Sequence, residues 1–232
     1  MVPVPRWEKE SLLGGCKTGY PVDVYFFDLD KTLYAYDFRY RLPELSRLTG
    51  ASQYHLAKTW WAAGNEFRAE LGSWPTADEY LDEFSRVTAT RRLSLEEWAS
   101  ARRLAMTRIP GSISALARAA ELGTVSLLSN NPAATATALP SLAPDVVEIM
   151  GPNLLFSYQL RARKPGQEIY RRALAHYAVD AADCFFADDS AANIEGARAV
   201  GITSHQLRFR HGVYDTDALV AAIEAFAVRG RS

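Results

Sequence analysis

The sequence is poor in the features that mark several large classes of protein. Its 232 residues contain only two cysteines, Cys16 and Cys184, so a disulfide framework is excluded and no zinc-ligand spacing is present. The 26 Lys and Arg stand against 27 Asp and Glu, and the formal net charge of −1 argues against a nucleic-acid binder, which normally has a basic excess. A small anionic substrate stays compatible with this balance, because a few residues suffice to bind one phosphate.

Long apolar runs are also missing. No uninterrupted apolar stretch is long enough to span a bilayer, so no membrane partner is expected. The N-terminal segment carries Arg6, Glu8 and Lys9 where a secretion signal needs an apolar run, which favours a cytoplasmic location. Hydrophobic residues make up 48% and charged residues 23% of the chain, an ordinary globular mixture that predicts a packed core.

Short apolar runs alternate with helical patterns along much of the chain. The runs are nearly continuous, as in strands that are covered on both faces of a parallel sheet. They lie at 22–27, 124–128 and 184–187, with a weaker one at 203–207, and the helical patterns lie at 112–122, 166–177 and 191–200. This order predicts an α/β fold with a doubly wound parallel sheet.

The stretch from 36 to 108 breaks this alternation, because all of its patterns are helical. Two capping boxes, Thr76 to Glu79 and Ser94 to Glu97, mark helix starts within it. Apolar residues also recur there at helical spacing. They are Leu56, Trp60, Ala63, Phe67 and Leu71.

Several helices without a strand, placed between the first and second predicted strands, indicate an insertion into the α/β core. We therefore expect three parts along the chain. They are an N-terminal tail at 1–20, a core domain at 21–35 and 109–232, and a helical cap domain at 36–108.

Two carboxylates and a hydroxyl follow the first predicted strand directly, at Asp28, Asp30 and Thr32. In an open parallel sheet, chemistry collects at the carboxyl ends of the strands. Such oxygens bind a hard cation, a carboxylate beside a metal can act as a nucleophile, and a second carboxyl group can protonate a leaving alkoxide. A calcium loop is excluded, because its sixth and twelfth positions would be Leu33 and Arg39. Taken alone, the motif fits a solvated turn equally well.

Three later segments place more polar groups at predicted strand ends or helix starts. Ser129 and Asn130 end the second strand ahead of a helix, where a hydroxyl, an amide and free N–H groups suit one phosphate. Lys164 precedes the next helix and offers a cation, and Asp188 and Asp189 end a later strand as a second acidic pair. Each segment alone fits a structural role as a cap, a solvated charge or a turn. Together with the first motif, they favour one catalytic site.

The four segments, in this order, resemble the motifs of the haloacid dehalogenase-like (HAD) hydrolase superfamily. The matching residues are Asp28, Asp30, Thr32, Ser129, Asn130, Lys164, Pro165, Asp188, Asp189 and Asn193. The resemblance covers nearly the whole chain from Val22 to about Leu207, and it implies a Rossmann-like core with an inserted all-helical C1 cap. Lys31 departs from the pattern, because many members have Gly or Asn there, and its side chain is expected to point away from the metal.

The resemblance also implies a role for each matching residue. Asp28 attacks phosphorus, and Asp30 protonates the leaving alcohol and then activates water against the aspartyl-phosphate. Mg²⁺ is the implied cofactor, bound by Asp28, the Asp30 carbonyl group and Asp189, with Asp188 in or beside the ligand set. The residues implied to position the phosphoryl group and offset its charge are Thr32, Ser129, Asn130 and Lys164.

Within the family, the residue two positions after the nucleophile separates the chemistries. Dehalogenases lack an aspartate there, because a halide leaves without a proton, so Asp30 favours phosphoryl transfer. We therefore expect a phosphatase that acts on a small-molecule phosphate monoester, with a sugar phosphate favoured. The alternatives are a nucleoside 5′-monophosphate phosphatase, a phosphomutase of the same fold and a catalytically silent binding module.

The predicted cap contains five large side chains that are candidates for lining a substrate pocket. Core aromatic residues and solvated arginines are nevertheless the more frequent roles of these residue types. The cap sequence therefore does not identify the substrate, and the chain carries no signal for an oligomeric state. The five candidates are Tyr36, Arg39, Trp60, Trp61 and Arg68.

Overall fold

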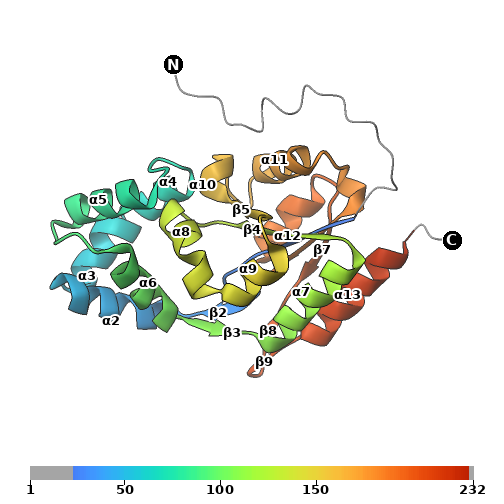
Figure 1. Cartoon of the computed structure of the whole chain (residues 1–232), viewed down its shortest axis with the longest axis horizontal. Coiled ribbons are helices and arrows are strands. Elements are labelled where there is room, and N and C mark those ends of the chain that lie inside the picture. Colours follow the sequence, from blue (N-terminus) through green and yellow to red (C-terminus); the bar gives the residue numbers. More distant parts are fainter. Residues whose placement is uncertain (1–22, 230–232) are drawn as a thin grey trace, which may run out of the picture.

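Five parallel strands form the central sheet of the computed structural model, which describes residues 23–229 (Figure 1). The strand order is β5-β4-β1-β6-β7. The predicted tail at 1–20, with Cys16, lies outside the described residues. The strands are β1 (Val24–Phe27), β4 (Thr124–Ser129), β5 (Leu154–Phe156), β6 (Cys184–Asp188) and β7 (Thr203–Gln206). Four of them lie where the apolar runs predict strands, and β5 is an addition of only three residues.

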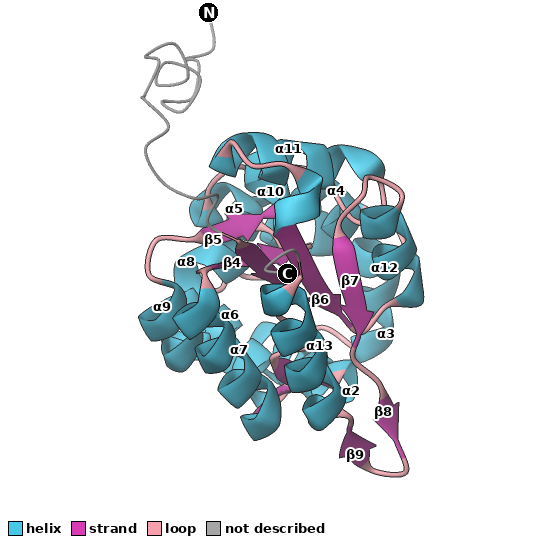
Figure 2. Ribbon diagram, turned by 90° about the vertical axis from the view of Figure 1, so that its right-hand side faces the viewer, coloured by secondary structure: helices cyan, strands magenta, loops and turns pink. Residues whose placement is uncertain are grey.

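Alternate residues of β1 enter two different hydrophobic cores. Tyr25 and Phe27 pack with one set of helices, while Val24 and Phe26 pack with another. Figure 2 shows the sheet between these two layers, which confirms the doubly wound α/β arrangement. The first layer holds α7 (Pro110–Leu122), α9 (Pro144–Met150) and α13 (Thr216–Val228); the second holds α10 (Ser157–Leu160), α11 (Gln167–Tyr177) and α12 (Ala191–Arg198), and a 3-10 turn (Ala181–Asp183) precedes β6.

A group of helices between β1 and β4 forms its own layer at one end of the molecule (Figure 1). Both predicted capping boxes are confirmed, at the starts of α5 and α6. The apolar core of this insert is continued by α8 (Ala133–Leu142), which follows β4 and contributes Ala134, Ala138 and Leu142 to it. The helices are α2 (Phe38–Thr49), α3 (Gln53–Leu56), the π-helix η1 (Ala57–Trp61), α4 (Asn65–Glu70), α5 (Ala77–Thr88) and α6 (Leu95–Leu104).

The insert differs from its prediction in two respects. The stretch 36–108 is not wholly helical, because β2 (Tyr34–Tyr36) pairs antiparallel with β3 (Met106–Arg108) and joins the insert to the core. The apolar spacing from Leu56 to Leu71 does not form one helix either. Gly64 has a φ of +76° and separates η1 from α4. Phe67 is 49% exposed as a result, and the apolar periodicity ends at this break.

A second short antiparallel pair, which the sequence patterns did not predict, follows the sheet. It consists of β8 (Phe209–Arg210) and β9 (Val213–Tyr214), with Gly212 at a φ of +83° in the turn. None of the helices within residues 23–229 combines the length and the apolar character needed to cross a membrane.

Close packing between α12 and the loop before α11 generates a stability prediction. A Cβ added at Gly196 would lie 2.3 Å from the Pro165 carbonyl oxygen, which is backbone and cannot rotate away. We expect Gly196→Ala to lower the free energy of unfolding by about 1–3 kcal/mol. Urea titration followed by circular dichroism measures this change. Glu195→Ala, at the exposed neighbouring position, is the control and should change stability by less than about 0.5 kcal/mol; equal stability of the two variants would contradict the packing argument.

Candidate active site

Asp28 lies at the carboxyl end of β1, between the ends of β4 and β6. The register pairs Phe27 with Leu127 and Ala187, so the residues that follow these strands meet at one edge of the sheet. Asp28 is 7% exposed, and its Oδ1 accepts a hydrogen bond from Ser129 Oγ at 2.8 Å. The same oxygen lies 2.8 Å from Lys164 Nζ. The structure therefore brings three of the predicted site residues into direct contact.

Asp188, at the end of β6, is fully buried and orients the lysine. Its Oδ2 accepts from Lys164 Nζ at 2.6 Å, and its Oδ1 accepts from the Ser190 N–H at 2.8 Å. Asn193 Nδ2 donates to both oxygens, at 2.9 and 3.0 Å. Because each oxygen already accepts two hydrogen bonds, Asp188 holds Lys164 and the start of α12 in place.

The carboxylates of Asp28, Asp188 and Asp189 form a group that fits a hard divalent cation. One oxygen of each lies within 4.8 Å of the others. Burial raises the pKa of Asp28 from 3.8 to about 7; Lys164 opposes this shift and the charge of Asp188 adds to it. Burial, followed by the charge of Asp188, also raises the pKa of Asp189. Negative charge thus exceeds what one lysine offsets, and Mg²⁺ would supply the missing positive charge.

The turn after Asp28 places Lys31 and Thr32 on different sides of the backbone. Lys31 has a φ of +64° and is exposed. This left-handed conformation is the one that favours Gly and Asn, which explains why those residues suit the position. Thr32 is fully buried, and its hydroxyl has no hydrogen-bond partner among the described residues. A buried hydroxyl of this kind fits an oxygen of a bound ligand.

The Asn130 side chain does not have the contacts expected of a phosphate ligand. Its Oδ1 accepts from the Lys164 N–H at 2.9 Å, and its Nδ2 donates to the Lys164 carbonyl oxygen at 2.9 Å. The amide therefore clamps the backbone of the lysine. Its expected contact with the phosphoryl group stays a prediction, and the structure adds a role in positioning Lys164.

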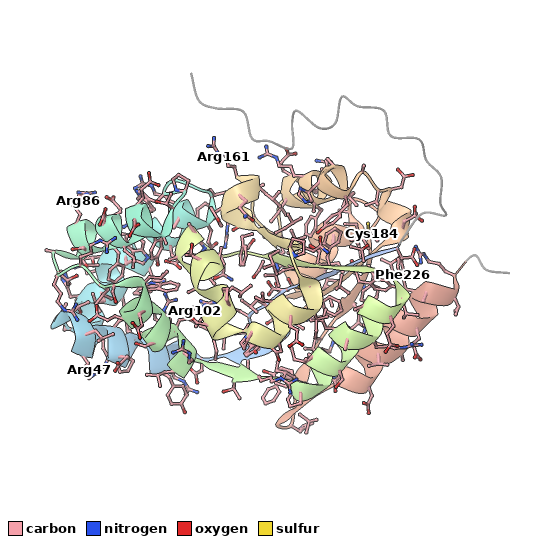
Figure 3. The ribbon with its side chains drawn as sticks, viewed as in Figure 1. Arg47, Arg86, Arg102, Arg161, Cys184 and Phe226 are labelled. Carbon is pink, nitrogen blue, oxygen red and sulfur yellow. The ribbon has the colours of Figure 1, made fainter. Side chains whose placement is uncertain are left out.

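Asp30 is held by two residues to which the sequence patterns assigned no role at the site. Arg102 Nη2 donates to Asp30 Oδ1 at 2.8 Å and to Oδ2 at 2.7 Å. Asn131 Nδ2 donates to Asp30 Oδ2 at 3.1 Å and to Ser129 Oγ at 3.0 Å. Arg102 belongs to α6 of the insert and is 3% exposed, and Figure 3 shows it on the side of the insert that faces the sheet. The insert thus contributes a buried cation to the catalytic edge.

A pocket of about 910 Å³ opens beside this edge, between the β2–β3 pair and the β8–β9 pair. Lys31, Asp189 and Tyr36 line it. Tyr36 is the only one of the five candidate pocket residues among its lining residues. Trp60 is buried in the insert core, and Arg39 is exposed in an ion pair with Asp37. The other two pack against aromatic rings, Trp61 against Phe38 and Arg68 over Trp74.

Known proteins resemble this chain in sequence and in fold. A sequence model of a family described as haloacid dehalogenase-like hydrolase matches residues 22–201. A HAD family enzyme from Bacteroides thetaiotaomicron, in complex with magnesium and inorganic phosphate, superposes with a TM-score of 0.62 at 19% identity, over 81% of this chain and 95% of that chain. A predicted HAD-like family hydrolase from Porphyromonas gingivalis gives 0.65 at 18% identity, over 80% and 90%. An L-2-haloacid dehalogenase gives 0.54 at 17%, over 88% and 100%. Identities this low show a shared fold.

The raised pKa of Asp28 predicts how stability depends on pH without a metal. Its folded pKa of about 7 exceeds the unfolded 3.8, so the protonated folded form is favoured at low pH. This contribution, on the order of 4 kcal/mol, is lost as pH rises from about 4 through 7. Asp28→Asn lacks it. In EDTA, the Tm of Asp28→Asn minus that of the wild type should therefore increase from pH 5 to pH 8.

Differential scanning calorimetry at both pH values measures this difference. The attraction to Lys164 is already contained in the pKa of Asp28, so the change of the Tm difference with pH is the informative quantity. Asp23→Asn, which alters a carboxylate that pairs with Arg229, is the matched control. A Tm difference for Asp28→Asn that stays constant or shrinks towards pH 8 would show that the carboxyl group is not destabilised by burial.

Proposed function

Because the chain belongs to the haloacid dehalogenase-like hydrolase family, we propose that it is a Mg²⁺-dependent phosphatase that hydrolyses a small phosphate monoester, with sugar phosphates the favoured class. The observation that carries the proposal is Asp30, a second carboxyl group two residues after the proposed nucleophile Asp28. A leaving alkoxide needs a proton, whereas a halide does not. We also propose that residues 36–108 act as the cap over this site.

Asp28 is the proposed nucleophile, and its neighbours fix its orientation. Ser129 Oγ and Lys164 Nζ both contact Asp28 Oδ1, which leaves Oδ2 for attack on phosphorus. Lys164 and the Ser129 hydroxyl also offset charge on the phosphoryl group, and the Thr32 hydroxyl is a further donor. The aspartyl-phosphate forms on Asp28 as the ester bond breaks and the alcohol leaves.

The proposed metal ligands are Asp28, the carbonyl group of Asp30 and Asp189, with Asp188 beside them. When bound, Mg²⁺ would neutralise charge on the phosphoryl oxygens. Asp188 is best suited to orient Lys164, because its oxygens already accept hydrogen bonds from Lys164, Ser190 and Asn193. Asp188 is therefore proposed to lie beside the metal rather than to bind it directly.

Asp30 is the proposed acid and base. It gives a proton to the departing alkoxide and then takes one from the water that attacks the aspartyl-phosphate. Asn131 and Arg102 hold its carboxyl group in place. The proton donor and Asp28 thus flank the phosphoryl group from one turn of the chain.

Three other activities use the same residues. A nucleoside 5′-monophosphate phosphatase differs in its leaving group, and a phosphomutase differs by excluding water from the aspartyl-phosphate. A silent binding module would lack at least one catalytic group, whereas all of the predicted groups are present here. Phosphate release from a panel of monoesters separates the phosphatase from the mutase and from the silent module.

The first prediction from this mechanism concerns turnover and metal dependence. With Mg²⁺, the wild type should release inorganic phosphate from at least one monoester in a panel of sugar, nucleoside and alkyl phosphates. EDTA should abolish this release, and Asp28→Asn should reduce it by at least about a thousandfold, because no aspartyl-phosphate forms. Asp145→Asn, which alters the carboxylate that pairs with Arg108, is the control and should retain activity. Failure of the wild type on the whole panel would disprove the phosphatase proposal.

The second prediction separates the role of Asp30 from that of Asp28. Asp30→Asn should reduce kcat on an alkyl phosphate by about 100-fold or more, because the alkoxide leaves without a proton. Single-turnover formation of the aspartyl-phosphate from p-nitrophenyl phosphate should suffer much less, because nitrophenolate leaves unprotonated. Rapid-quench kinetics with both esters measures the two losses. Equal losses on both esters would contradict general-acid catalysis by Asp30.

A further inference from the structure

Arg41 in α2 is a buried guanidinium group for which the proposed mechanism has no use. It is 2% exposed, and although the charge of Glu66 acts on it, no carboxylate of the described residues lies within ion-pair distance of it. Its Nη1 donates to the Tyr36 hydroxyl at 3.0 Å, while its Nε and Nη2 have no hydrogen-bond partner among the described residues. The Trp98 ring, 4.7 Å from the guanidinium carbon, offsets part of the charge. A buried guanidinium group with two unpaired N–H donors is unfavourable.

Arg102 contacts the ring of the same tyrosine. Its guanidinium carbon is 4.9 Å from the centre of the Tyr36 ring, and its Nε also has no partner in the described part of the chain. Its Nη2 contacts both oxygens of Asp30. Arg41, Tyr36 and Arg102 thus form a continuous row from the interior of the insert to the proposed proton donor. Tyr36 also lines the pocket that opens beside Asp189.

We propose that Arg41 and Arg102, with Tyr36 between them, form a binding subsite for a second anionic group carried by the leaving alcohol of the substrate. The inference rests on the proposed phosphatase function and defines the substrate class of that site. The unpartnered atoms of both arginines are N–H donors, which match a group that only accepts hydrogen bonds. A carboxylate and a second phosphate both meet this requirement, whereas a hydroxyl group also carries a proton that these N–H donors cannot accept.

The position of the subsite relates it to the leaving alcohol. Arg102 contacts Asp30, and Asp30 is the residue that would protonate the departing oxygen. A group bound by the arginines is therefore expected next to the departing alcohol. Access requires the insert to move relative to the core, and the β2–β3 pair, which carries Tyr36, is the connection about which it would move.

Non-hydrolysable phosphonates test the subsite without turnover. The probes are 3-phosphonopropionate, ethane-1,2-diphosphonate and 3-methylbutylphosphonate, an isostere of the first that lacks the carboxylate charge, each titrated calorimetrically with Mg²⁺ present. The wild type should bind at least one of the two probes that carry a second anionic group about tenfold or more tightly than the isostere. The preferred probe identifies the second group as a carboxylate or a phosphate. Arg41→Met should reduce this preference to about twofold or less.

Arg47→Met is the matched control, because Arg47 lies on the same helix but pairs with Glu44 at the surface, and it should keep the wild-type preference (Figure 3). If Arg41→Met does not fold by circular dichroism, Arg102→Met replaces it with the same expected loss. A wild type that binds all three probes equally, or an Arg41→Met that keeps the preference, overturns the subsite. Preference without hydrolysis of any monoester overturns the phosphatase proposal, and with it the link to a leaving alcohol, but leaves anion binding by the arginines standing. Hydrolysis without preference overturns the subsite alone.

Discussion

The buried ammonium group of Lys164 is the interaction on which the catalytic edge depends. It lies between Asp28 and Asp188, at 2.8 and 2.6 Å, and it is 1% exposed. These two carboxylates end β1 and β6, which are neighbouring strands, and would repel each other without it. One lysine cannot balance them together with Asp189, so the fold retains a local excess of negative charge. That excess of negative charge favours the binding of a divalent cation.

The surroundings of Lys164 follow from the need to hold this charge. Asn130 bonds to its backbone N–H and carbonyl groups, and Asn193 shares the oxygens of Asp188 with it. Gly196 lets α12 approach the Pro165 carbonyl, so the loop that carries the lysine is packed from behind. Packing and hydrogen bonding thus oppose the motion that would let water reach the ammonium group. A lysine fixed in this way presents its charge without reorganisation, as electrostatic stabilisation of a phosphoryl group requires.

The sequence predicts which side chains meet at the carboxyl edge of the sheet, because parallel strands end at one edge and a residue at a strand end is placed by its strand alone. Asp28, Ser129 and Asp188 are of this kind. Arg102 is different: its contact with Asp30 spans 72 residues and depends on how α6 packs, which no local pattern encodes. The hydrogen bond from the Lys164 N–H to Asn130 involves the backbone of a loop distant in sequence, which no local pattern predicts. Strand β5 has only three residues, too few to show a recognisable apolar pattern. The apolar spacing from Leu56 to Leu71 predicts one continuous helix, but Gly64 divides it into η1 and α4.

The insert is coupled to the chemistry through charge as well as through packing. Arg102 crosses to Asp30, and Glu70 of α4 crosses to Arg163, the residue before Lys164, at 2.7 Å. Burial raises the pKa of Glu70 to about 7, while the charge of Arg163 opposes the shift. The charge of Glu70 therefore depends on whether it is buried against Arg163. Both contacts end next to a proposed catalytic group. A displacement of the insert would therefore release Asp30 and the Lys164 loop together. Since α8 continues the insert core directly after Asn131, the same displacement also reaches the end of β4. The position of the insert and the order of the side chains at this edge of the sheet are therefore linked.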